Sequence, residues 1–541
     1  MRGWITGTIV GALTASMLLL LPTAADVPAT AALTSDAPLA TWAPSSPMTL
    51  ASIEGQRCSK RGATRVIGSD TYRCVGKGKK LVWKRETPPT PSVKDGDPCG
   101  IAGQRVSNPA GYLECRAVAG NRLVYRQLSL QPKSPGFASS PEAIDACRLG
   151  DTRVNRGRPP GPGGTLISEA IAYPVTSATR PLVMPASGKT RVAILPYDFS
   201  DVPGDPSPQS WLGPQMKLVD DWIEHYSSGR VEYEWVTSDS WIRASKPSSE
   251  YQFIHPSRSG VMPPDLPQGP FKTEQWIAQD LLASAPDSLD LSGVRAVFFV
   301  YPQDVFYPYD LPVREVTVNH PDFPRSFLMF ASGRWLYEQK MPLWSFINHE
   351  FGHFQGIPGH APWDGSPLDV MTNQHGLAIT LGTWSRMTMD WQDTREIYCT
   401  TRERLADDLV TLSAIDSEEM GTKAILVRLS ESQALIIESR RRSTWSSGDK
   451  GWPGLPPGFY GLTLIRVDTS VDLNRVQRAG AYLDFIDGGE RGHGELFSPG
   501  FRIPPFDLDK VIYEGESIVT DGVRISLVKS GDHDTVQVSR A

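Results

Sequence analysis

Residues 344–371 read WSFINHEFGHFQGIPGHAPWDGSPLDVM, and the rest of the chain is interpreted around them. His349 and His353 are four residues apart, so on a helix they project from one face and can bind a single metal ion together. Glu350 follows the first histidine, where its carboxylate can take a proton from a water that the metal activates. Zn²⁺ suits two imidazoles and leaves positions open for water and substrate. This stretch predicts a zinc site with a general base beside it.

The helix is expected to end soon after the second histidine. Gly356 comes three residues after His353, where a glycine can end a helix, and Pro358-Gly359 is a further turn signal. His360 follows this turn, and our main hypothesis makes it the third zinc ligand. In the alternative, His360 is an ordinary loop histidine and the third ligand is another residue: Asp364, Asp369 or a distant glutamate.

A methionine follows the histidines at a position that indicates a turn beneath the metal. Met371, in LDVMT, lies where a methionine-containing turn would pass beneath the metal. The stretch resembles the metzincin metallopeptidases, whose pattern is HExxHxxGxx(H or D) followed by a Met-turn. The third ligand of that family would fall at Gly359, with His360 one residue later, so we expect one extra residue in the turn. No tyrosine follows closely after Met371, so the role that some metzincins give to a tyrosine there is vacant or filled elsewhere.

Further segments narrow the resemblance to one family. They are similar to immune inhibitor A and related secreted bacterial metallopeptidases over roughly residues 191–399, and more faintly beyond. The segments are FSD (199–201), HYSSGRVEYEWV (225–236), VFFVYP (297–302), HEFGHFQGIP (349–358) and LGTWSRMTMDW (381–391). This resemblance implies a zinc metalloendopeptidase that acts on proteins or peptides.

The chain starts with the features of an export signal. An apolar run covers residues 5–21 and small-residue sites follow, so residues 1–31 read as a secretory signal peptide. The alternative is an uncleaved N-terminal anchor, because the run approaches spanning length. We expect a secreted protein, which either is released outside the cell or stays associated with the cell wall.

Six cysteines in an exported chain predict disulfides. Four of them fall in an internal repeat that covers residues 50–86 and 93–128, with cysteines sixteen apart in each copy. Each copy is too small for a sizeable core, so a disulfide within each copy makes physical sense. The predicted pairs are Cys58–Cys74 and Cys99–Cys115, which leaves Cys147–Cys399 to tie the start of the catalytic domain to its end.

The first repeat is crowded with basic residues: Lys60, Arg61, Lys77, Lys79, Lys80, Lys84 and Arg85. A basic module on an exported protein could bind an anionic cell wall. The alternative is a solvated surface on a spacer or propeptide. The formal net charge of the chain is -6, which argues against nucleic acid as a partner.

The order of the remaining segments predicts the fold class. Residues 129–188 are a linker, and residues 189–400 alternate strand and helix patterns, as expected of an α/β (α+β) metzincin-like catalytic domain. Residues 401–541 carry short strands at fairly regular spacing, which indicates a C-terminal β-sandwich. Two small disulfide-stapled repeats precede these domains.

The functional hypothesis is a secreted zinc endopeptidase with Glu350 as general base, and we expect a monomer. A cleft-side strand at residues 326–331 would bind the substrate by adding it to the sheet. Two rivals remain: a wall-binding protein on a catalytically impaired peptidase scaffold, and a metal-dependent amidase that acts on wall peptides. Structural Ca²⁺ is compatible with an exported peptidase, although the sequence has no EF-hand loop.

Overall fold

The computed structural model describes residues 56–541 with gaps at 68–69, 78–79, 87–92, 101–103, 109–110, 121, 129–133, 150–183, 205–206, 252–273, 303–304, 306–310, 318–324, 333–341, 358–359, 361–367, 373–375, 450–453, 472–482 and 497–504. The predicted signal peptide (1–31) and Asp364 lie outside the described residues. Contacts divide the chain into two compact units, Met1–Pro88 and Pro89–Ala541. The finer boundaries expected at residues 128, 188 and 400 stay predictions. In the described part, none of the helices has the length and hydropathy needed to cross a membrane.

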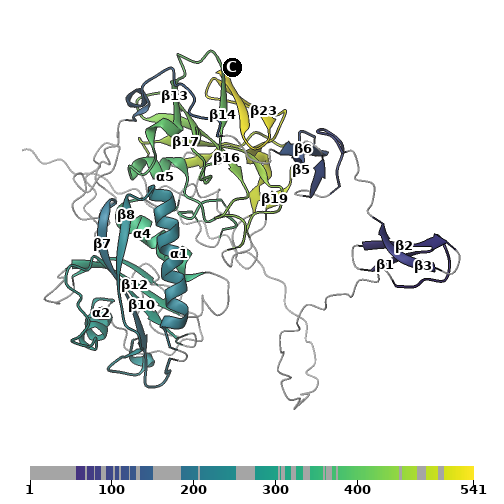
Figure 1. The fold of residues 1–541 in the computed structure, drawn as a ribbon. Coiled ribbons are helices and arrows are strands. Elements are labelled where there is room, and N and C mark those ends of the chain that lie inside the picture. Colours follow the sequence, from purple (N-terminus) through teal and green to yellow (C-terminus); the bar gives the residue numbers. More distant parts are fainter. Residues whose placement is uncertain are drawn as a thin grey trace, which may run out of the picture. The chain divides into compact units, whose positions relative to one another are not determined.

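Both repeats form a three-stranded antiparallel sheet, with the strands in sequence order (Figure 1). The strands of the first are β1 (Thr64–Ile67), β2 (Asp70–Lys77) and β3 (Lys80–Glu86); those of the second are β4 (Arg105–Asn108), β5 (Gly111–Val118) and β6 (Arg122–Leu128). A disulfide closes each repeat, Cys58–Cys74 in the first and Cys99–Cys115 in the second. Cys74 and Cys115 are fully buried, so the disulfides form the centres of these small cores.

The α/β part of the chain is built on one mixed sheet with the order β11-β12-β10-β7-β8. The strands β12, β10, β7 and β8 run parallel to one another. At one edge of the sheet, β11 pairs antiparallel with β12. The strands are β7 (Gly188–Asp198), β8 (Val231–Thr237), β10 (Ala296–Tyr301), β11 (Leu311–Thr317) and β12 (Arg325–Ser332), and a short β9 (Ile242–Arg243) pairs with the end of β7. This is the mixed α/β class expected from the sequence.

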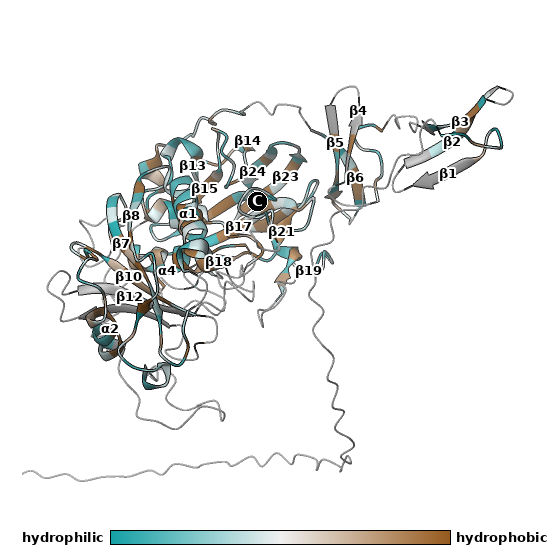
Figure 2. Cartoon of the chain, turned by 60° about the horizontal axis from the view of Figure 1, so that its bottom comes forward, coloured by the Kyte–Doolittle hydropathy of each residue, from teal (hydrophilic) through white to brown (hydrophobic). Residues whose placement is uncertain are grey.

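Helices cover both faces of this sheet, because alternate residues of a strand point to opposite faces. One face packs against α1 (Gln209–Ser227) and α4 (Leu343–Gln355), through strand residues such as Ile194 and Phe298. The other face packs against α2 (Glu274–Ala283), through residues such as Leu195 and Phe299. Figure 2 shows the mostly hydrophobic colouring of β10 and the mixed colouring of α1, as expected of a buried strand and a surface helix.

The C-terminal part consists mainly of two sheets that share one apolar core. The first has the order β13-β15-β16-β17-β18, with β21 also pairing with β17, and the second has the order β14-β24-β23-β22. The first contains β13 (Ile397–Thr401), β15 (Ala424–Arg428), β16 (Gln433–Arg441), β17 (Tyr460–Asp468), β18 (Leu483–Phe485) and β21 (Val511–Ile512). The second contains β14 (Asp407–Leu412), β22 (Ser517–Thr520), β23 (Val523–Ser530) and β24 (Asp534–Arg540). A shared core between two sheets is the arrangement that a sandwich requires.

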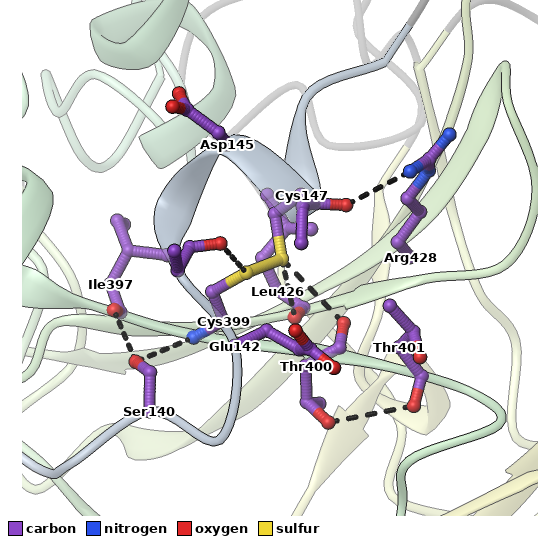
Figure 3. The surroundings of a disulfide bond; sticks show 12 residues. Ser140, Glu142, Asp145, Cys147, Ile397, Cys399, Thr400, Thr401, Leu426 and Arg428 are labelled. Atoms are coloured by element: carbon purple, nitrogen blue, oxygen red, sulfur yellow. Dashed lines mark hydrogen bonds between the residues drawn. A yellow bond between two sulfur atoms is a disulfide. The ribbon is translucent and has the colours of Figure 1, made fainter.

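The third disulfide joins segments that are 252 residues apart (Figure 3). Cys147 ends a short 3-10 helix, η1 (Ile144–Cys147), and Cys399 lies in β13; both are buried. Ser140 fixes the same junction, since its hydroxyl donates to the carbonyl oxygen of Ile397 at 3.2 Å and accepts from the Cys399 N–H at 2.9 Å. The two disulfides within the repeats are the pairs that the cysteine spacing predicts, and the third joins the two cysteines that remain.

Candidate metal centre

Helix α4 and the turn after it bring three histidines together. His349 and His353 lie one turn apart on α4, and His360 follows the end of the helix. The Nε2 atom of His349 lies 3.1 Å from Nε2 of His353 and 3.1 Å from Nε2 of His360. One ligand atom of each ring lies within 4.8 Å of the other two. The extra residue expected in the turn is therefore compatible with His360 reaching the other two rings.

Helix α4 ends at Gly356, as expected from the sequence. Gly356 adopts a left-handed conformation with φ 114°, and its N–H donates to the carbonyl oxygens of Gly352 and His353. A residue with a Cβ is disfavoured in this conformation, so glycine is the natural residue for the turn. The chain reverses there and returns His360 to the histidine face of α4.

The hydrogen bonds of the rings favour a metal ion among them. Nδ1 of His349 lies 2.7 Å from the carbonyl oxygen of Val370, and Nδ1 of His353 lies 3.0 Å from that of Ile357. A carbonyl oxygen only accepts, so each Nδ1 is assigned as the donor, and each neutral ring then presents an Nε2 lone pair. Two lone pairs at 3.1 Å repel each other unless a cation lies between them. Tetrahedral Zn²⁺, with Zn–N near 2.0–2.1 Å, separates its ligand atoms by about 3.3 Å, so the donor set fits.

Glu350 lies beside the histidine cluster. Its carboxylate oxygen Oε1 is 3.9 Å from Nε2 of His349, and the residue is only 3% exposed. At this distance the carboxylate is adjacent to the histidine nitrogens, where it can accept a proton from a water at the centre of the cluster.

Met371 packs against helix α4. It is fully buried, and a Cβ placed on Gly352 would lie 2.6 Å from the Met371 sulfur. Gly352 lies between the two helical histidines, so this glycine lets the methionine approach the helix at the level of His349 and His353. The segment after the histidines thus passes next to α4, as a Met-turn would.

Asp369 shapes this turn and is an unsuitable third ligand. Its carboxylate accepts the N–H of Met371 at 2.8 Å and the N–H of Gly382 at 2.7 Å. Burial raises the pKa of Asp369 to about 6, while the nearby Arg440 guanidinium acts in the opposite direction. Both oxygens are thus engaged with the backbone of the turn. Among the described residues, the metal-compatible group consists of the three histidines.

Residues of the C-terminal sheet support the turn at Met371. The sequence marked residues 438–440 for support or substrate contact but did not locate their contact with this turn. Arg440 in β16 donates to the carbonyl oxygen of Leu368 at 2.6 Å and to Oγ1 of Thr380 at 2.9 Å. It also pairs with Glu438, whose other oxygen accepts the N–H of Thr383 at 2.6 Å. Arg440 is 3% exposed and Glu438 is fully buried. The signal available in the sequence was two opposite charges at alternate positions of the apolar strand LIIESR.

The prediction of residues 326–331 as the substrate-binding strand is wrong. β12 is paired on both sides, with β11 antiparallel and with β10 parallel, so its backbone groups have no open side for a peptide. The strand at this edge is β11, which follows β10 in sequence but lies outside β12. The period of a strand shows which residues share a face but not the order of strands in a sheet.

The comparisons with known proteins add little. No protein-family model matches the chain, and no curated protein matches it at a significant level. Catalytically inactive OgpA from Akkermansia muciniphila, solved in complex with an O-glycopeptide (glycodrosocin), is a structural match with 11% sequence identity and a TM-score of 0.21. The match covers 58% of this chain and 93% of that one. This TM-score is too low for the match to indicate a function.

Proposed function

We propose that the protein is a zinc-dependent endopeptidase of the metzincin type, similar to the immune inhibitor A family. The observation that carries the proposal is the convergence of three histidine Nε2 atoms with the buried carboxylate of Glu350 beside them. His349, His353 and His360 would bind the zinc ion. Bound zinc supplies Lewis-acid polarisation of the scissile carbonyl and lowers the pKa of a water molecule to near neutrality.

Glu350 has the role of general base. Its carboxylate takes a proton from the attacking water and then passes that proton to the leaving amine. The burial of Glu350 supports this role, because a carboxylate shielded from bulk solvent interacts more strongly with the charge that develops next to it. The Nδ1 hydrogen bonds of His349 and His353 to backbone carbonyl oxygens keep the rings oriented toward the centre of the cluster.

The edge strand β11 is our candidate for the substrate contact. An extended peptide would pair with the backbone groups of β11 that do not face β12, and so extend the sheet. The pairing of β11 with β12 shifts register between Val313 and Val316. A bulge of this kind re-aims a strand and is common next to active sites.

The test compares wild type with Glu350→Gln on an unfolded protein substrate, with zinc content measured for both. Loss of the general base should lower turnover roughly a hundred- to ten-thousand-fold while zinc stays bound. Glu224→Gln, an exposed change on α1, is the matched control and should cut like wild type. Zinc-loaded wild type that cuts no protein contradicts the proposal. In that case, release of products from wall peptides would favour the amidase, and inactivity on both would favour the wall-binding protein.

The third ligand has a separate test. His360→Ala should weaken zinc binding, measured by competition with a chromophoric chelator. Unchanged zinc affinity would show that another residue completes the site.

We also propose that the protein is exported as a monomer, with cell-wall contact through its N-terminal part. The composition of residues 1–31 and the three disulfides, which persist in oxidising compartments, support export. Sequencing the N-terminus of the protein from the culture medium tests this. A protein found only inside the cell would contradict it.

A further inference from the structure

The second repeat and the C-terminal sheets enclose a cavity of about 630 Å³. Both belong to the compact unit Pro89–Ala541. Glu114 and Arg116 of β5 form one wall, and the C-terminal part forms the rest. Small-molecule sites in proteins have volumes of roughly 300–1,000 Å³, so this cavity is large enough for a ligand. The C-terminal segments that line it include residues 416–419, 441–444, 457–460 and 532–533.

Two arginines of the cavity wall meet at the turn between β23 and β24. The carbonyl oxygen of Gly531 accepts a hydrogen bond from Arg116 at 2.5 Å and another from Arg441 at 2.6 Å. Arg116 also pairs with Glu114 at 2.9 Å. Arg441 pairs with Asp534 at 2.6 Å, and both carboxylates are buried. The polar side chains of this wall are therefore held in fixed positions by contacts between the repeat and the C-terminal sheets.

One acceptor and one donor of the wall lack a partner. Asp416 and Arg441 both line the cavity. Oδ1 of Asp416 and Nε of Arg441 are buried, and neither has a hydrogen-bond partner among the described residues. Burial raises the pKa of the Asp416 carboxyl to about 6, while Arg440, Lys423 and Arg441 act in the opposite direction. Because unsatisfied buried polar atoms are costly, a bound group that supplies both a donor and an acceptor is favoured here.

These two atoms select the chemistry of the bound group. A hydroxyl can donate to Oδ1 of Asp416 and accept from Nε of Arg441 at the same time. An ammonium group only donates, and an ionised phosphate diester only accepts, so either one leaves one of the two atoms unsatisfied. Water has the same double capacity as a hydroxyl, which makes ordered water the alternative occupant.

The charge of the cavity favours a neutral ligand. Its lining contains five carboxylates and three guanidinium groups, a formal charge of -2 with His533 neutral. All three guanidinium groups are engaged within the protein, because Arg442 donates to the carbonyl oxygen of Ser447 and the other two are bound as described above. Glu419 lies 3.7 Å from the ring of His533. An anionic ligand would therefore meet an excess of negative charge and few available cations.

We propose that this cavity binds a neutral oligosaccharide. Neighbouring hydroxyls of a sugar match the planar guanidinium and carboxylate groups of the lining, each of which offers two adjacent positions for hydrogen bonds. Pro457 and Phe459 add apolar surface beside these polar groups, as required by the C–H face of a sugar ring. The second repeat thus takes part in recognition through Glu114 and Arg116. This proposal does not depend on the peptidase activity of the metal centre.

The test measures binding of the full chain to an array of immobilised neutral, acidic and amino-substituted oligosaccharides and of unmodified peptides. Calorimetry with the free form of the strongest neutral sugar then gives its affinity. The array includes neutral fragments of wall polysaccharides and glycans attached to peptides, so it distinguishes these two sources of the same chemistry. Affinity should hardly change between about 0.05 and 0.5 M salt, because salt screens interactions between charges and the ligand has none.

Two cavity variants and one control locate the site. Arg441→Lys keeps a cation beside Asp534 but has no Nε–H, so it should weaken binding roughly tenfold, with folding verified by urea unfolding. Glu418→Ala removes an exposed carboxylate of the lining, so it should leave folding intact and also weaken binding. Glu431→Ala is the matched control, because it removes an exposed glutamate of the C-terminal part that does not line the cavity, and it should bind like wild type.

Five results would overturn the proposal. The first is the absence of binding to every neutral oligosaccharide, which would leave ordered water as the occupant. The second is tighter binding to charged sugars or to unmodified peptides, and the third is a steep fall in affinity with salt. The last two are wild-type affinity in both cavity variants and an equal loss in Glu431→Ala.

Discussion

The buried pair Glu438–Arg440 should control zinc affinity from outside the α/β part of the chain. Arg440 binds the carbonyl oxygen of Leu368, two residues before Val370, whose own carbonyl oxygen accepts the Nδ1 hydrogen of His349. The guanidinium is thus connected to His349, a proposed zinc ligand, through one short backbone segment. A partner that orients a ligating histidine typically changes metal affinity by about 10- to 100-fold.

The informative perturbation removes both charges together. Arg440→Met alone leaves Glu438 buried and unpaired, which should destabilise the protein by about 3–5 kcal/mol and complicate any binding measurement. The double variant Glu438→Gln/Arg440→Met removes the unpaired charge, so most of that stability should return. It still lacks the donor to Leu368, so the double variant should bind zinc about tenfold or more weakly than wild type.

The neighbouring residue in β16 gives a matched control. Arg441 pairs with the fully buried Asp534 at 2.6 Å, on the side of the strand that faces away from the turn at Met371. Arg441→Met/Asp534→Asn therefore removes a comparable pair without touching Leu368. Zinc affinity is read by chelator competition, and stability by urea unfolding of the zinc-free proteins. Wild-type zinc affinity in Glu438→Gln/Arg440→Met, or an equal loss in the control, would refute the reasoning and leave the pair with a purely structural role.

Two further changes test the surroundings of helix α4. Gly352→Ala places a methyl group against the Met371 sulfur, which should destabilise the protein by about 1–3 kcal/mol in urea unfolding and weaken zinc binding; unchanged stability would show that the methionine does not pack as described. Burial lowers the pKa of His225 to about 4, with Arg386 and Lys423 acting in the same direction, so unfolding takes up a proton as pH falls below about 6.5. The contribution of His225 to the free energy of unfolding should therefore be constant above pH 6.5 and fall by up to about 3 kcal/mol toward pH 4. The variant His225→Gln should lack this contribution, so its stability should fall less between pH 6.5 and pH 4. Parallel stability–pH curves for the two proteins would contradict this.

Features set by short-range spacing could be predicted from the sequence. His349 and His353 project from one face because the helical period is fixed, and Gly356 ends the helix because glycine tolerates its left-handed conformation. The disulfides within the repeats follow from cysteines whose separation matches between two copies. In each case the geometry depends on a few neighbouring residues.

Features set by long-range topology could not be predicted in the same way. The position of β12 inside the sheet depends on where the chain places β11 after β10, and the residue pattern of a strand does not contain this information. Glu438 and Arg440 reach the turn at Met371 because a strand about 70 residues later in sequence packs against it. The contact between the second repeat and the C-terminal part likewise depends on Glu514, which is 388 residues from its partner Arg126.

The disulfide Cys147–Cys399 makes the region between its cysteines a covalent ring. The histidine cluster, Glu350 and the whole mixed sheet lie inside this ring, whereas the repeats and nearly all of the C-terminal sheets lie outside it. A single cut anywhere inside the ring, by this protein or by another protease, therefore leaves the two pieces joined until the disulfide is reduced. In the chain-entropy description, a disulfide that closes a ring of this size lowers the conformational entropy of the unfolded chain. This stabilises the folded protein by about 5 kcal/mol. Reducing and non-reducing gels of an aged sample would then differ, because nicked molecules keep their full mass until a thiol is added.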